Sequence, residues 1–98
     1  MSADSEAEME GRIIALELLF REFLTQRTVS NFDKPLAQAK RYRTDFLALL
    51  QHLDRGPPSE RGDLIWEEAS RAIRLSLDMV VNRIEGAQRS GLVPPDAE

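Results

Sequence analysis

Residues 13–24 read IIALELLFREFL, and nine of these twelve residues are apolar. In a helix that turns by about 100° per residue, most of them fill roughly half of the circumference. An ordinary surface helix carries an apolar stripe of little more than a quarter. Ile14 and Leu18 form a second stripe outside this arc. We expect the broad arc to face the core and the second stripe to face a partner, so the segment predicts assembly.

The composition is typical of one folded domain, with 98 residues of which 42% are hydrophobic and 31% are charged. The chain has no cysteine, so its own residues supply no disulfide bond, thiolate nucleophile or thiolate metal ligand. Its net charge of −4 argues against non-specific binding to nucleic acid or to an anionic membrane.

The N-terminal segment also bears on the compartment. Its first ten residues carry four carboxylates and no lysine or arginine, which is the reverse of a secretory signal. The apolar run of about twelve residues is too short to span a bilayer. We therefore expect a cytoplasmic protein with no membrane association.

Three segments have helical apolar periodicity, two breaks rich in turn residues separate them, and none alternates as a strand does. This pattern predicts an all-α fold, a three-helix up-down bundle completed by homodimerisation into a larger helical bundle. We expect one domain over residues 1–98, with helices at about 5–27, 34–54 and 60–90 and flexible tails at 1–4 and 92–98.

Several residues have the spacing of helix caps. Ser5 and Glu8 match a capping box for the first helix, and Asp33 is the expected N-cap of the second, with Phe32 packing back onto it. Two residues compete for the N-cap of the third helix, Ser59 and Asp63.

Gly91 is the expected C-terminal stop of the third helix, because glycine accepts the left-handed conformation that ends a helix. Leu92 is then expected to fold back onto the last turn.

The predicted lengths also favour a dimer, since the third helix is about 40 Å long and the others about 30 Å. We expect its C-terminal end to overhang, and exposed branched aliphatic side chains there would forfeit about 1.5–3 kcal/mol each. A tight monomer whose central helix is contacted on both sides remains the alternative. The interface candidates from this reasoning are Ile14, Leu18, Phe20, Trp66, Val80, Val81 and Ile84.

The charged residues predict solvated helix faces and no catalytic, cofactor or metal site. The single histidine, His52, has no second ligand at helical spacing and is expected at the surface. Most of the other charges form pairs four residues apart, each stabilising an exposed helix by about 0.2–0.5 kcal/mol. These pairs are Glu8–Arg12, Glu17–Arg21, Glu67–Arg71, Arg74–Asp78 and Glu85–Arg89.

Arg43 is the exception, because it falls inside the apolar arc of the second helix. It is expected to extend its charge to the rim, to pair with a carboxylate, or to bind an anion. It also belongs to a basic cluster with Lys34, Lys40 and Arg41.

These observations favour a small non-enzymatic interaction or regulatory module that self-associates, with a further protein partner left open. One alternative is a nucleic-acid-associated regulator that uses the basic start of the second helix with Arg71 and Arg74, although the charge makes nucleic acid a less expected partner. The other alternative is a ligand-binding bundle with a pocket near Arg43 and Trp66.

Overall fold

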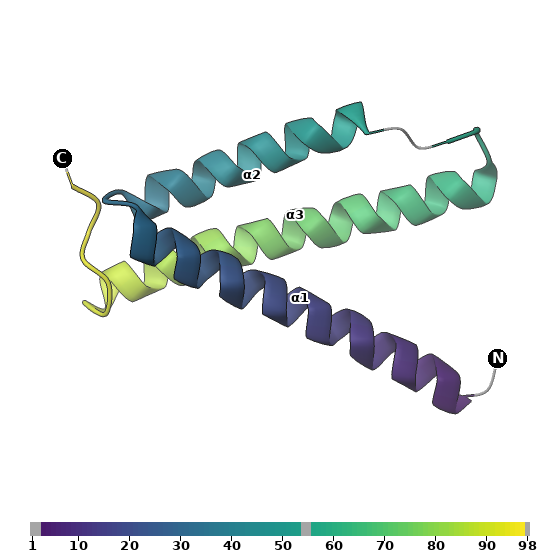
Figure 1. Ribbon diagram of the computed structural model, residues 1–98, viewed down its shortest axis with the longest axis horizontal. Helices are drawn as coiled ribbons and strands as arrows, with labels where there is room; N and C mark the ends of the chain where they lie inside the picture. Colours follow the sequence, from purple (N-terminus) through teal and green to yellow (C-terminus); the bar gives the residue numbers. More distant parts are fainter. Residues whose placement is uncertain (1–2, 54–55, 98) are drawn as a thin grey trace.

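The computed structural model describes residues 3–53 and 56–97. The described part of the chain contains three helices and no strand: α1 (Ala3–Asn31), α2 (Pro35–His52) and α3 (Glu60–Arg89) (Figure 1). The all-α prediction with three helices is therefore confirmed.

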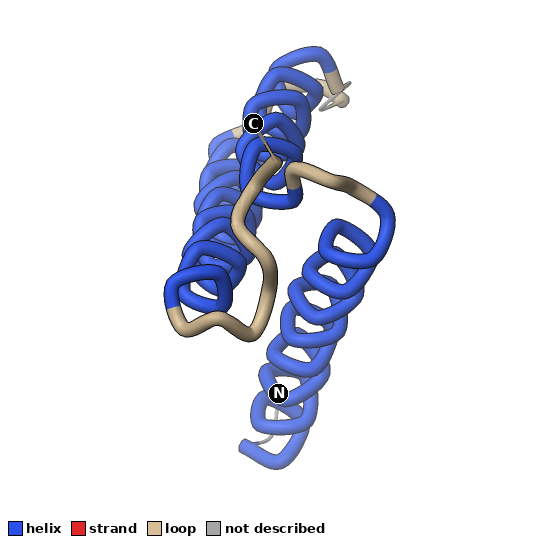
Figure 2. Tube along the Cα trace, turned by 90° about the vertical axis from the view of Figure 1, so that its left-hand side faces the viewer, coloured by secondary structure: helices blue, strands red, loops and turns tan. Residues whose placement is uncertain are grey.

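The helices meet at one end of the molecule and diverge toward the other. The C-terminal ends of α1 and α3 and the N-terminal end of α2 lie together, and α2 and α3 then continue side by side (Figure 1). Helix α1 diverges from this pair along its length, as the second view also shows (Figure 2). The molecule is an open three-helix arrangement with one closed end.

The core lies at the closed end. It contains one apolar side chain from α1, one from α2 and four from α3: Leu24, Ala39, Leu77, Val80, Val81 and Ile84. Val29, Tyr42 and Phe46 pack around it while remaining partly exposed. Because every contribution from α1 comes from its C-terminal third, the rest of α1 lies outside the core.

The predicted overhang at Val80, Val81 and Ile84 is wrong, because these side chains are at most 3% exposed. In an up-down order the C-terminal end of α3 returns to the point where α1 ends and α2 begins, so both helices cover it. These three residues are therefore not available as an interface. The N-terminal ends of α1 and α3 lie far apart, because α1 diverges from α3 toward its own N-terminus (Figure 1).

Helix α1 is longer than predicted at both ends. It begins at Ala3, which places the predicted capping residue Ser5 inside the first turn. It continues to Asn31. Within this extension and just before it, Thr28 and Thr25 donate their hydroxyls to the carbonyls of Leu24 and Arg21, at 2.6 and 2.7 Å. Such bonds let buried threonines stay within a helix with their polar atoms satisfied.

Helix α2 begins with a cap that comes from the other end of the chain. Asp33 does not cap it, and Lys34 at the N-cap position makes no side-chain cap bond. Instead the carboxylate of Asp96 accepts hydrogen bonds from the backbone N–H groups of Leu36 and Ala37, at 3.0 and 2.9 Å. The predicted flexible tail thus folds back onto α2.

The predicted end of this helix at Asp54 lies outside the described residues.

The Phe32 side chain packs onto α2 as expected, with its ring edge-to-face against Tyr42 at 6.1 Å between centroids.

Helix α3 begins at one of its two expected N-caps and ends at its expected C-terminal stop. Ser59 is the N-cap, and its hydroxyl accepts the N–H of Gly62 at 2.9 Å. Gly91 adopts φ +82°, and the N–H of Leu92 reaches the carbonyl of Ala87 at 2.9 Å, which is the Schellman arrangement.

The predicted fold-back of the Leu92 side chain is wrong, since it is 82% exposed. After Gly91 the chain turns toward α2, and Val93 is partly buried in its place.

Candidate assembly surface

Polar contacts attach α1 to α3. The guanidinium of Arg21 donates to the hydroxyl of Ser76 at 3.1 Å and contacts Glu17 on its own helix at 3.4 Å. At the next residue of α1, the carboxylate of Glu22 accepts two hydrogen bonds from the guanidinium of Arg83. The side of α1 that faces α3 is therefore partly polar, and the apolar arc of α1 points elsewhere.

Glu22 is held in its charged form by these neighbours. A hydrogen bond from the Gln26 amide lowers the pKa of Glu22, and the hydrogen bonds and charge of Arg83 lower it further. The pair is solvent-exposed, so it contributes little to the stability of the fold.

The apolar arc of α1 is exposed, contrary to the expectation that it faces the core. Leu19, Leu16 and Phe23 are 67%, 65% and 64% exposed. The second stripe is exposed as well, with Ile14 at 50% and Leu18 at 57%. Large apolar side chains therefore surround the free part of α1: Met9, Ile13, Ile14, Leu16, Leu18, Leu19, Phe20 and Phe23.

Two apolar grooves flank the contact between α1 and α3. One is lined mainly by Leu16 and Phe20 of α1 with Ala72 and Ile73 of α3. The ring of Phe20 also reaches α2, where it lies edge-to-face against Phe46 at 6.3 Å.

The second groove lies on the other side of α1 and includes Leu18, Leu19, Met79 and Val80. The α1–α3 pair is thus open on both sides, and each side presents aliphatic surface.

The surface area and the radius of gyration of the chain are those of an open structure and exceed those of a compact domain. Its solvent-accessible surface is 7608 Å², whereas a folded monomer of 11.1 kDa typically exposes about 5,700 Å². Its radius of gyration is 16.4 Å, against about 13 Å for a compact domain of 100 residues. The single chain leaves far more surface in water than a closed bundle of this size does.

Arg43 pairs with a carboxylate, one of its three expected roles. Its guanidinium donates to Asp78 of α3 at 3.1 Å, within one chain. The predicted Arg74–Asp78 pair is wrong because Arg43 takes this carboxylate. The other four predicted pairs are confirmed, with separations from 2.6 to 3.7 Å.

The expected ligand pocket is only partly assembled. Trp66 lines a shallow hollow between α2 and α3, with Leu47 and Leu50 opposite it. The arginine in this hollow is Arg74, and Arg43 is not among the lining residues.

The basic cluster is divided in the same way. Arg43 is paired with Asp78, and Arg41 lies 3.8 Å from Asp45. Lys34 and Lys40 remain exposed. His52 is the last residue of α2 and is exposed, as expected.

No cluster of three metal-binding side chains occurs within residues 3–53 and 56–97. None of the helices, over the same residues, combines the length and the apolar character needed to cross a membrane. Comparison with protein-family models, with curated proteins and with solved structures found no match to this chain.

The sequence analysis missed Met9, Leu16, Leu19 and Phe23 as surface residues. The positions of Glu17 and Arg21 could have indicated this exposure. These two polar residues lie on the same face of α1 as the buried Leu24 and Thr28. That face is the side of α1 that meets α3, and the apolar arc lies away from it.

Proposed function

We propose that the protein is a non-enzymatic helical module that assembles with a second copy of itself through α1. The observation that supports this proposal is the exposed apolar face of α1, which carries eight large side chains between 37% and 67% exposed. Each such side chain that stays in water loses roughly 1 kcal/mol or more of the free energy that its burial would provide. A partner that covers them recovers this free energy.

The area of this face also suits a dimer. Large exposed apolar side chains surround the free part of α1, whereas monomers usually expose such residues singly. A standard stable interface buries about 800 Å² on each partner, an area that several such side chains and their neighbours supply. Closed two-fold symmetry is the commonest way in which one chain covers such a patch.

Light scattering coupled to size exclusion, over a dilution series in the micromolar range, tests the proposal. We expect a mass of twice 11.1 kDa at the higher concentrations. A constant mass of 11.1 kDa throughout the series would contradict self-association.

A further inference from the structure

We propose that the two copies pair α1 against α1 in antiparallel orientation, around a two-fold axis at Leu16. This inference rests on the self-association proposed above and adds the contact surface and its direction. The surface is the α1 seam, which we define as Met9, Ile13, Leu16, Phe20 and Phe23.

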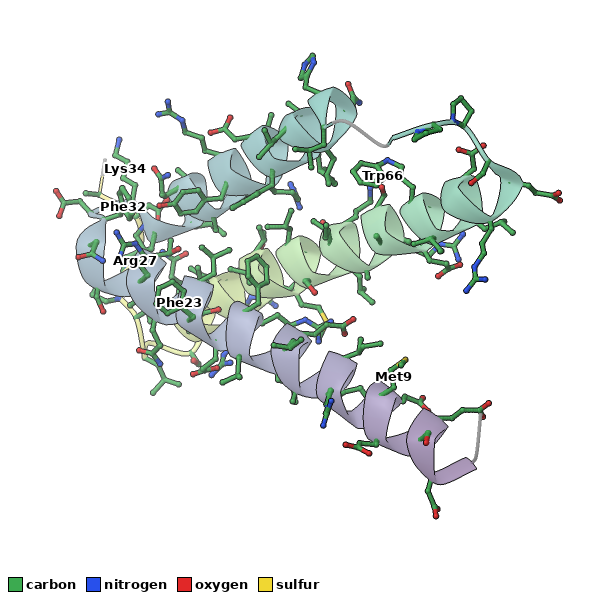
Figure 3. All side chains as sticks on the ribbon, turned by 45° about the vertical axis from the view of Figure 1, so that its right-hand side comes forward. Met9, Phe23, Arg27, Phe32, Lys34 and Trp66 are labelled. Carbon is green, nitrogen blue, oxygen red and sulfur yellow. The ribbon has the colours of Figure 1, made fainter. Side chains whose placement is uncertain are left out.

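The α1 seam has the spacing of a coiled coil. Its members follow one another at intervals of four, three, four and three residues, which keeps them in line along a pair of helices. All five are exposed, from 37% at Phe20 to 65% at Leu16. Met9 lies toward the free end of α1, and Phe23 lies toward the end where the three helices meet (Figure 3).

The α1 seam lies next to the side of α1 that contacts α3. Leu16 and Phe20 border the groove toward α3, and the ring of Phe20 contacts Phe46 of α2. A second series with the same spacing, Glu17, Arg21, Leu24 and Thr28, faces α3: the last two residues are buried and Arg21 bonds Ser76. The two series are offset by about 100° on the helix. A second copy can therefore occupy the α1 seam while each chain keeps its own α1–α3 contacts.

The charges at the two ends of the α1 seam are opposite. Four carboxylates precede or flank it at the N-terminal end of α1: Asp4, Glu6, Glu8 and Glu10. At the other end Arg27 continues the same spacing, four residues after Phe23. Neither Glu6 nor Arg27 makes an ion pair within the part of the chain that the structure describes.

This charge pattern selects the antiparallel orientation. A parallel pair would bring the two acidic ends together, and like charges at close range repel. An antiparallel pair centred on Leu16 brings Arg27 beside Asp4 and Glu6 of the second copy, twice by symmetry. The exposed Lys34 lies beyond Arg27 at the same end of the molecule (Figure 3) and adds positive charge there.

Single cysteines test the orientation directly, because the chain has none of its own. With a short bis-maleimide, L16C is expected to form a covalent dimer with itself. A mixture of M9C and F23C is expected to cross-link, while each of these variants alone cross-links little. L64C serves as the matched control, since Leu64 is equally exposed but lies on α3.

The outcomes separate the two proposals. Strong cross-linking of M9C with itself would show a parallel pair and overturn this inference. A dimeric mass without cross-links at Leu16 would place the interface elsewhere and overturn it too. A monomeric mass for the unmodified chain would instead remove the proposed function on which the inference rests.

Exchange of the charges provides a second, independent readout. R27E is expected to weaken the dimer about threefold to tenfold, as the loss of two exposed ion pairs does. The double variant R27E/E6R is expected to regain the original dissociation constant. Equal dissociation constants for the unmodified chain and R27E would show that Arg27 does not face the acidic end.

Discussion

At the scale of single residues, Asp96 has the most informative role outside α1. Its carboxylate caps α2 from 60 residues away in the sequence, and it also accepts the Gln88 amide at 2.7 Å. A negative charge at this position suits the positive end of the α2 helix dipole. The last residues of the chain therefore close the end of the molecule where the core lies.

Replacing Asp96 by alanine is expected to lower the free energy of unfolding by about 0.5–2 kcal/mol, the usual range for loss of an N-cap. Asp33→Ala is the matched control, because Asp33 has the sequence position of a cap but no capping role. Urea denaturation of both variants measures the difference. Equal stability of the two variants would show that the Asp96 contact is unimportant in solution.

The contribution of Asp96 is also expected to depend on pH. Partial burial raises the pKa of Asp96, but hydrogen bonds from two backbone N–H groups and from Gln88, with the charge of Lys34, outweigh it, and the pKa is lowered. A lowered pKa in the folded state means that the stabilisation is present above about pH 4, the unfolded value, and is lost as the pH falls through the folded value. The stability difference between the unmodified chain and Asp96→Ala is thus expected to shrink below about pH 4. A difference that stays constant from pH 6 to pH 3 would contradict a charged cap.

The sequence predicts local contacts of single residues well and distant ones poorly. The Ser59 cap, Gly91 and four of the five intrahelical ion pairs depend on residues within a few positions of each other. The Asp96 cap and the Arg43–Asp78 pair join residues far apart in the sequence and depend on how the helices pack. Helix periodicity does not show how helices pack against each other, and for this reason the sequence analysis predicted Asp33 as the cap of α2.

At the scale of elements, α1 has a buried side and an exposed side. Leu24 and Thr28 near its C-terminal end are buried, and the α1 seam, from Met9 to Phe23, is exposed. The helical wheel correctly gave two apolar faces but assigned the broad arc to the core. Apolar character predicts that a surface is buried against something, but it does not show whether the same chain or a second chain buries it.

The two apolar faces of α1 can be compared with matched variants. Leu16 and Leu18 are both leucines, 65% and 57% exposed, but only Leu16 belongs to the α1 seam. Leu16→Glu is expected to raise the dimer dissociation constant at least 100-fold, because two charges would be buried at the two-fold axis. Leu18→Glu is expected to raise it less than tenfold.

Sedimentation equilibrium gives both dissociation constants, and circular dichroism checks that each variant stays helical. The reverse ranking would place the interface on the Ile14–Leu18 stripe, as the sequence predicted.

At the scale of the whole molecule, the open arrangement leads us to expect that the order of α1 depends on assembly. The part of α1 before Phe20 has few neighbours in its own chain, and an isolated helix of this length is marginally stable in water. The helix pair α2–α3 and the closed end hold the core and do not need this segment. We therefore expect local unfolding of α1 to require far less free energy in the monomer than unfolding of the core.

The sequence could not predict this shape, although it predicted the three helices. Helix lengths suggested an overhang at Val80 and Ile84, but the angle at which α1 leaves the bundle decides which end is open. The contacts between α1 and α3, among them Arg21 with Ser76 and Glu22 with Arg83, join positions more than 50 residues apart.

Hydrogen–deuterium exchange at two protein concentrations, one well above and one well below the dimer dissociation constant, tests the central claim most directly. The backbone amides of residues 9–23 are expected to be protected at the high concentration and to lose most of this protection on dilution. The core amides of residues 77–84 in α3 are expected to keep theirs and so serve as the internal control. Equal protection of residues 9–23 at both concentrations would contradict the claim that a second copy covers α1.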